Sequence, residues 1–141
     1  MRLSTLAATL VLVAASGSAA LAGPIGDLAK SRIDAIASGD LAAVTAAYDP
    51  AATLHWVGGP LDGTYGQPGK IREIWSKFFA AQGAQKATVA TTAEAANPKG
   101  GTVTVDVAFA GKNTVKVRYV LLYRDGKLVD EIWQVNPAAT Y

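Results

Sequence analysis

The spacing of apolar residues changes once along this chain. Between residues 24 and 83 most apolar positions recur every three or four residues, and from residue 85 onward they alternate with polar ones. A period near 3.6 indicates amphipathic helices, whereas a period of two indicates strands that bury one face. The pattern therefore predicts helices first and a sheet afterwards.

Three helices are predicted in the first part. Pro24 can open the first helix, because it lacks only a donor that is unpaired there, and Gly39 can end it. Asp40 is placed to cap a second, shorter helix that stops before residue 50. Pro68 opens the third helix and Gly83 ends it. The apolar stripe of the third helix consists of Ile71, Ile74, Trp75 and Phe78.

Five strands are predicted. One lies between the second and third helices, at 53–57, and is followed by a glycine-rich loop at 58–66 without regular structure. The other four are expected at 86–94, 102–110, 114–124 and 127–135. Asp125-Gly126 is a strong signal for a tight hairpin, so these four strands should form an antiparallel meander. The result is one domain of the α+β class.

The first residues are typical of an export signal. Arg2 supplies a positive charge, residues 3–13 are apolar, and Ala20-Leu21-Ala22 has the form of a cleavage site. An uncleaved membrane anchor is the alternative, although the apolar run is shorter than the ~20 residues that a span needs. We therefore expect a cleaved signal at 1–22, a single domain at 23–141, a periplasmic or secreted location, and no membrane association after cleavage.

Composition excludes several kinds of chemistry. The chain has no cysteine, which excludes thiol catalysis and disulfides, and its one histidine, His55, excludes a multi-histidine metal site within one chain. We expect neither a metal nor a cofactor. The formal net charge of +2 is close to neutral, which argues against non-specific binding of nucleic acid.

The order of elements resembles that of the nuclear transport factor 2-like superfamily, and more closely its SnoaL-like group. The resemblance is carried by Gly39-Asp40-Leu41, residues 48–54, the 58–66 loop, Gly69-Lys70-Ile71-Arg72 and residues 125–129. It implies a cone-shaped, curved antiparallel sheet wrapped around three N-terminal helices (a cystatin-like or NTF2-like roll), a pocket inside the cone, and often a homodimer through the outer sheet face. It names no function, because this fold hosts isomerases, dehydratases, hydrolases and non-catalytic binders.

The ketosteroid isomerase branch of this superfamily provides a residue-level comparison. By spacing, its catalytic carboxylate falls near Trp56, its tyrosine donor near Arg32 and its second acid near Tyr119. Proton abstraction needs a positioned base, which tryptophan cannot supply. Steroid-type isomerisation by that arrangement is therefore not expected.

Glu131, Tyr119 and His55 are the candidates for acid–base chemistry. Glu131 shares a strand face with Trp133 and would suit this role if buried, or it forms an ordinary ion pair, for instance with Arg118. Tyr119 either donates to a ligand carbonyl or bonds only to the protein. Strict alternation places His55 opposite Trp56, on the outer face.

Three further charged side chains have weaker claims. Asp106 is expected to be solvated or paired with Lys116. Arg32 and Arg72 lie on predicted helices, where they are either solvated or clamp an acidic ligand.

The aromatic residues suggest a small-molecule site. Most of them should form core, yet an aromatic-lined cavity with a few polar groups is also the usual form of such a site. The predicted ligand-binding residues are Trp56, Trp75, Phe78, Tyr119, Glu131, Trp133 and His55. The leading hypothesis is an exported domain that binds a small, largely apolar molecule. The alternatives are a cofactor-independent isomerase, lyase or hydrolase, and a non-catalytic dimerisation module.

Overall fold

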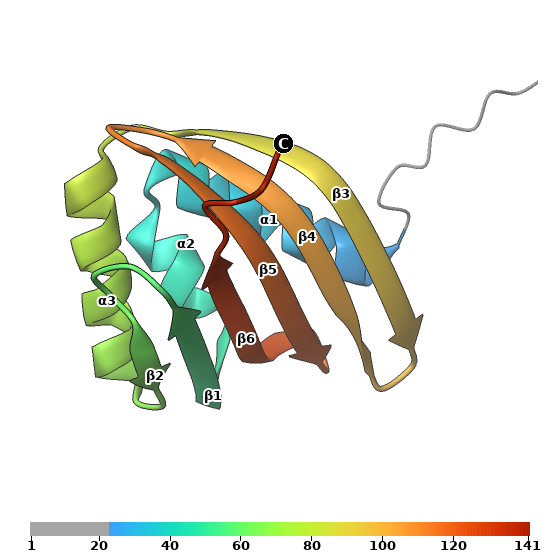
Figure 1. Ribbon diagram of the computed structural model, residues 1–141. Coiled ribbons are helices and arrows are strands. Elements are labelled where there is room, and N and C mark those ends of the chain that lie inside the picture. Colours follow the sequence, from blue (N-terminus) through green and yellow to red (C-terminus); the bar gives the residue numbers. More distant parts are fainter. Residues whose placement is uncertain (1–22) are drawn as a thin grey trace, which may run out of the picture.

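The computed structural model describes residues 23–141, so the predicted export signal lies outside the described residues (Figure 1). A strongly curved six-stranded sheet lies over three helices. The helices are α1 (Pro24–Ser38), α2 (Leu41–Ala46) and α3 (Pro68–Gln82). The strands are β1 (Tyr48–Val57), β2 (Gly63–Tyr65), β3 (Lys86–Asn97), β4 (Gly100–Ala110), β5 (Thr114–Arg124) and β6 (Lys127–Val135). The predicted α+β class, with a curved sheet wrapped around helices, is confirmed.

The sheet has the order β2-β1-β6-β5-β4-β3. The last four strands form the predicted antiparallel meander. β1 joins this meander through a parallel pairing with β6, which places Leu54 beside Glu131 and Trp56 beside Trp133. Parallel neighbours need a long crossover, which α3 and β3 to β5 provide. Residues from distant parts of the chain thus become neighbours in the middle of the sheet.

Two local predictions were wrong. The loop at 58–66 contains a short strand, β2, because the chain turns back at the loop and Thr64 pairs with His55 of β1. β1 also begins at Tyr48 and not at residue 53. The residue before a proline is disfavoured in a helix, so Asp49-Pro50 is extended, and the carbonyl of Ala47 accepts a hydrogen bond from the amide of Leu128.

The predicted helix ends and the predicted hairpin are confirmed. α1 ends at Gly39, which adopts the left-handed conformation with φ 69°, and the Asp40 side chain accepts a hydrogen bond from the Ala43 amide at 3.0 Å. Both hairpin residues, Asp125 and Gly126, have positive φ, at 48° and 75°. This geometry matches the twist of the strands β5 and β6 that they join.

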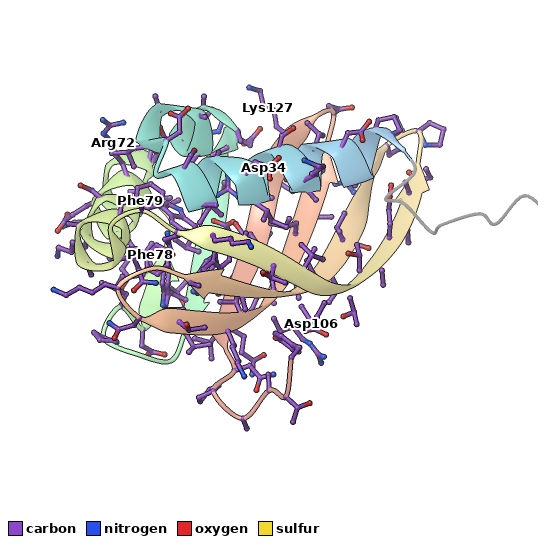
Figure 2. The ribbon with its side chains drawn as sticks, turned by 90° about the horizontal axis from the view of Figure 1, so that it is seen from above. Asp34, Arg72, Phe78, Phe79, Asp106 and Lys127 are labelled. Carbon is purple, nitrogen blue, oxygen red and sulfur yellow. The ribbon has the colours of Figure 1, made fainter. Side chains whose placement is uncertain are left out.

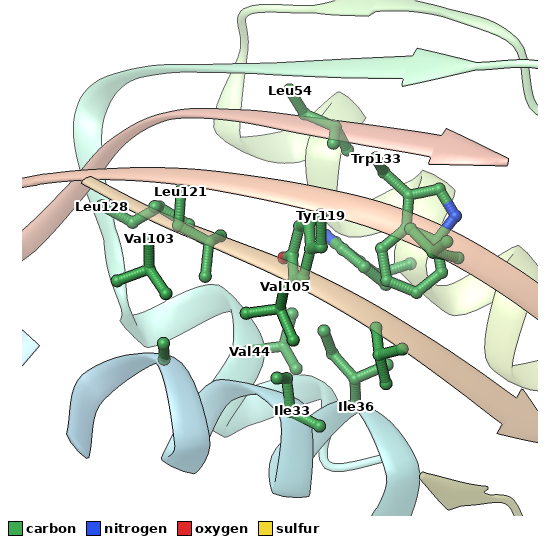
Figure 3. Close-up of a cluster of buried hydrophobic side chains, with 14 of the residues drawn as sticks. Ile33, Ile36, Val44, Leu54, Val103, Val105, Tyr119, Leu121, Leu128 and Trp133 are labelled. Atoms are coloured by element: carbon green, nitrogen blue, oxygen red, sulfur yellow. The ribbon is translucent and has the colours of Figure 1, made fainter. Parts of the chain in front are cut away.

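The core lies between the helices and the inner face of the sheet. Figure 3 shows Ile33 and Ile36 of α1 facing Val103 and Val105 of β4, with Val44 of α2 beside them, and all five are buried. Burial of such side chains supplies most of the stabilisation of a domain that lacks disulfides. No helix within residues 23–141 is long and apolar enough to cross a membrane.

The outer face of the sheet is partly covered by the C-terminal segment. The Lys116 side chain donates to the carbonyl of Ala139 at 2.8 Å, and the Tyr141 hydroxyl donates to the carbonyl of Val117 at 3.1 Å. Figure 2 shows Asp106 on this outer face and Asp34 on α1. The segment is bonded to β5, and Val57 of β1 and Ile132 of β6 are exposed in the β1–β6 part of the outer face.

Candidate functional site

Aromatic side chains fill the space where β1 and β6 meet α3. The ring of Trp133 is fully buried, and five other rings surround it. Their centroids lie 4.9 to 5.3 Å from that of Trp133, and they belong to Trp56, Trp75, Phe78, Phe109 and Tyr119. Such contacts are typical of a packed interior. Trp75 and Trp133, both predicted to bind ligand, here pack against one another and other rings.

A buried polar cluster lies next to these rings. Arg32 comes from α1, Glu131 from β6, and the Nη2 and Oε2 atoms of the two side chains are 3.1 Å apart. The Arg32 Nε donates to the Tyr119 hydroxyl at 2.6 Å, and its Nη2 donates to the Tyr48 hydroxyl at 2.6 Å. The Trp75 indole N–H also donates to the Tyr48 hydroxyl, at 2.7 Å. The cluster therefore ties α1 and α3 to three strands.

Both carboxylate oxygens of Glu131 are occupied. Oε1 accepts hydrogen bonds from the Tyr48 hydroxyl and from Arg32, and Oε2 accepts from the Tyr119 hydroxyl and from Arg32. The remaining Arg32 donor, Nη1, reaches the carbonyl of Val44 at 3.0 Å. A buried charge is tolerated when it is paired and fully hydrogen-bonded in this way. The geometry is that of a saturated structural pair.

The electrostatics keep Arg32 charged and the phenols of Tyr48 and Tyr119 protonated. Burial opposes the charge of Arg32, but the attraction of Glu131 and of the two tyrosine oxygens raises the pKa of its guanidinium well above the usual value. Burial, together with the charge of Glu131, raises the pKa of the Tyr48 hydroxyl. Burial likewise raises the pKa of the Tyr119 hydroxyl, although Arg32 acts in the opposite direction. Both phenols therefore stay protonated as hydrogen-bond donors at neutral pH.

The alternative prediction for Glu131, an ion pair, was correct, but the suggested partner Arg118 was wrong, because the partner is Arg32. Glu131 points to the inner face, whereas Arg118 points outward and binds Asp106, with 2.9 Å between Nε and Oδ1. The suggested pairing of Asp106 with Lys116 was also wrong. Asp106 lies directly opposite Arg118 in the register of β4 and β5, and it also accepts from the Thr91 hydroxyl at 2.7 Å.

The sequence reasoning missed the buried role of Arg32. It treated the residue as solvated or as a ligand clamp, yet the side chain is buried. A signal was present, because Arg32 follows Ala29 by three residues and precedes Ile36 by four, on the apolar stripe of α1. Tyr48 was missed for a different reason, since its role depends on where β1 begins.

His55 lies on the outer face, as alternation predicted. Its Nε2 is 3.2 Å from Asp130 Oδ1, and its Nδ1 is 3.4 Å from the Thr64 hydroxyl oxygen. The side chains of His55 and Asp130 are both partly exposed. His55 therefore has no access to the interior. Within residues 23–141 no group of three or more histidine, aspartate or glutamate side chains is placed to hold a metal ion.

A pocket of about 260 Å³ opens at the edge of the aromatic cluster, and we call it the Trp56 pocket. It is lined by Trp56, Gly59, Pro60, Leu61, Lys77, Phe78, Ala81, Gln82, Asn113, Val115 and Val135. Figure 2 shows Phe78 on the side of α3 that faces the sheet. Of the predicted ligand-binding residues, the Trp56 pocket brings together Trp56 and Phe78.

The loop between β1 and β2 forms one wall of the Trp56 pocket. The Gly58 amide donates to Asp62 Oδ1 at 2.7 Å, and the Tyr65 hydroxyl donates to the carbonyl of Leu61 at 2.7 Å. Gly58 and Gly59 have positive φ values of 93° and 72°, a conformation that glycine adopts without strain. The loop thus holds Leu61 over the pocket in a defined position.

Helices under a curved, mostly antiparallel sheet, with a small pocket at one end, define a protein of the cystatin-like or NTF2-like class. A profile of the SnoaL-like domain matches residues 29–131, and the chain belongs to this family. A search of curated proteins finds no match.

Several solved structures share this fold. One is a protein of unknown function with a cystatin-like fold from Nostoc punctiforme, 13% identical, with a TM-score of 0.67 over 83% of this chain and 92% of that one. An NTF2-like protein of unknown function from Pseudomonas putida is 14% identical, with a TM-score of 0.66 over 77% and 81% of the two chains. A putative calcium/calmodulin-dependent protein kinase II association domain from Xanthomonas campestris is 17% identical, with a TM-score of 0.67 over 82% and 87%. At these identities the likeness concerns the fold alone.

Proposed function

We propose that this protein binds a small, largely apolar molecule in the Trp56 pocket. One observation carries the proposal: two core aromatic residues, Trp56 and Phe78, line the same opening as apolar side chains from the β1–β2 loop, β5 and β6. Aliphatic and aromatic walls with few polar groups are typical of small-molecule sites. The pocket's volume of about 260 Å³ lies just below the ~300–1,000 Å³ of sites for drug-sized ligands, so the ligand should be smaller than a drug-sized molecule.

Binding is favoured over catalysis because of how Glu131 is used. The enzyme hypothesis needs Glu131 and Tyr119, or His55, at the ligand. Glu131 and Tyr119 are buried and bonded to Arg32, and His55 lies on the outer face. A general base must come within hydrogen-bond reach of the proton that it removes. None of these three residues lines the Trp56 pocket.

Titration with naphthalene, observed by amide chemical shifts and tryptophan fluorescence, tests the proposal. We expect saturable shifts at Leu61, Ala81 and Val115, and a change in tryptophan emission. Ala81→Glu should abolish these effects, because it places a carboxylate against the apolar wall. Ala42→Glu makes the same change on α2, away from the Trp56 pocket, and should leave them intact. Absence of saturable shifts in the unaltered protein, or equal behaviour of the two variants, would overturn the proposal.

A homodimer through the outer sheet face is a second proposal. Val57 and Ile132 are among the large apolar side chains exposed on the described surface, and they lie on neighbouring strands of the open β1–β6 region. Exposed apolar residues that cluster in this way favour an interface. We also propose that the protein is exported, with residues 1–22 as its signal. Both proposals have their tests in the Discussion.

A further inference from the structure

A second pocket lies between α2, the beginning of β1 and the beginning of α3. Its volume is about 380 Å³, and we call it the Arg72 pocket. It is lined by Thr45, Tyr48, Asp49, Pro50, Ala52, Pro68, Gly69, Ile71 and Arg72. No residue is shared with the lining of the Trp56 pocket. The two pockets are therefore separate sites. The volume of the Arg72 pocket falls within the size range of small-molecule sites.

The floor of the Arg72 pocket is apolar. Ala52 and Ile71 are buried core residues that contribute to it, and Pro50 and Pro68 add to the apolar wall. Tyr48 also lines the pocket, and its hydroxyl bonds to Glu131, Arg32 and Trp75 inside the protein. The ring is held in place by these bonds, so this wall is preorganised for a ligand.

The rim of the Arg72 pocket carries one cationic side chain, that of Arg72. It makes no ion pair and no side-chain hydrogen bond with any residue in the described range 23–141. By contrast, its neighbours Lys70 and Lys77 both pair with Glu73, at 3.2 and 3.1 Å. Figure 2 shows Arg72 at the side of α3 that lies next to α2. A guanidinium left without a carboxylate partner beside an apolar floor is complementary to a ligand carboxylate.

One acidic residue, Asp49, also lines the pocket. Its Oδ1 accepts a hydrogen bond from the Ala51 amide at 2.9 Å, which uses part of its acceptor capacity within the β1 backbone. No ion pair joins Asp49 to Arg72 among the described residues. Arg72 therefore keeps its donors for a ligand.

We propose that the Arg72 pocket binds a small monocarboxylate with an apolar body. The carboxylate would bond to the Arg72 guanidinium, and the body would lie against the Tyr48 ring and Ile71. This site is additional to the Trp56 pocket and does not depend on it.

Three probes with the same apolar body and different heads test the proposal: phenylpropanoate, phenylpropanol and phenylpropylamine. Each is titrated into the purified protein and followed by amide chemical shifts. We expect phenylpropanoate to shift Ala52 and Ile71 and to bind about tenfold more tightly than the alcohol. The amine should bind more weakly than the alcohol. Arg72→Gln should remove this preference for the acid and leave binding of the alcohol unchanged.

Arg124→Gln is the matched control, because Arg124 is also an exposed arginine and lies at the end of β5, outside the Arg72 pocket. It should bind the acid like the unaltered protein. The proposal is overturned if acid and alcohol bind equally, if the amine binds best, if Arg72→Gln has no effect, or if shifts appear only at Leu61 and Ala81. The last result would place the acid in the Trp56 pocket, and failure of naphthalene binding there would not affect the Arg72 pocket.

Discussion

Arg32 of α1 and Glu131 of β6 form an ion pair in the interior, with 3.1 Å between Nη2 and Oε2 and with side chains that are only 1% and 0% exposed. The pair joins the helical layer to the sheet. Two tyrosine hydroxyls, from Tyr48 and Tyr119, saturate the carboxylate. Glu131 and Tyr119, two of the candidates for acid–base chemistry, are thus members of a structural network.

Replacing Glu131 by glutamine should strongly destabilise the protein. The change leaves the Arg32 guanidinium buried without a counter-charge, and breaking such a pair costs about 3–5 kcal/mol. Urea unfolding followed by circular dichroism measures the loss. Lys30→Gln is the control, since Lys30 and Asp34 form an exposed pair on α1 and its loss should change stability little. Equal stability of Glu131→Gln and the unaltered protein would contradict a structural role.

Alkaline pH should unfold the protein through its buried phenols. Burial raises the folded-state pKa of Tyr48 and Tyr119 well above 10.0, and raises that of Tyr123 to about 12. In the unfolded chain these phenols ionise near pH ~10. Stability is therefore fully present below pH ~10 and falls as the pH rises towards the folded-state pKa values, because the unfolded state loses its protons first.

The ultraviolet absorbance of tyrosinate measures this behaviour. In the folded protein these three of the five tyrosines should ionise together with unfolding, whereas in urea all five should titrate in one step near pH ~10. Early, reversible ionisation of all five tyrosines without unfolding would be inconsistent with the buried cluster.

Alanine should be tolerated at Gly66 and not at Gly101. A Cβ atom at Gly101 would lie 2.6 Å from the carbonyl oxygen of Ala95 and 3.1 Å from a side-chain carbon of Ile25, so α1 and β3 would have to move. At Gly66 a Cβ meets nothing within 4 Å. We expect Gly101→Ala to cost about 1–3 kcal/mol and Gly66→Ala to cost little, as measured by thermal unfolding. Comparable melting temperatures would show that this close approach of helix and sheet does not matter.

Lysine at Val57 should dissociate the proposed homodimer. Val57 is 42% exposed on the outer face, and Val89 is 44% exposed on the edge strand, where it pairs with the inward-facing Val107. Val57→Lys and Val89→Lys therefore make the same substitution at similarly exposed sites, the first on the outer face and the second on the inner face of the sheet. Light scattering should show a monomer for the first and a dimer for the second. A monomeric unaltered protein would rule out the dimer at the concentration used.

Export should remove the first residues of the chain. If the signal is cleaved after Ala22, mass spectrometry of the exported protein should show Gly23 as its first residue. Replacing Ala22 by arginine should block cleavage after this residue, because signal sites require small residues. Retention of the full chain inside cells would contradict the proposed periplasmic or secreted location.

Most elements of the fold follow from local physics. The helix ends are marked by residues whose own backbone preferences begin or stop a helix: Pro24, Gly39, Pro68 and Gly83. The alternation of the strand was enough to place His55 on the outer face. The short strand β2 was not predicted, because a segment of three residues forms a strand only when the edge of another strand, here β1, is available for pairing.

The partners of the buried residues were decided by the tertiary structure. Arg32 and Glu131 are 99 positions apart, and no local pattern states which carboxylate a helical arginine will meet. The parallel pairing of β1 with β6 brings Glu131 beside Leu54 and Trp133 beside Trp56, so the rings pack against one another and the Trp56 pocket lies at the edge of their cluster. The sequence by itself determined helices, strands and their faces, because these depend on neighbours along the chain. Which side chains meet was settled only when the sheet curved over the helices.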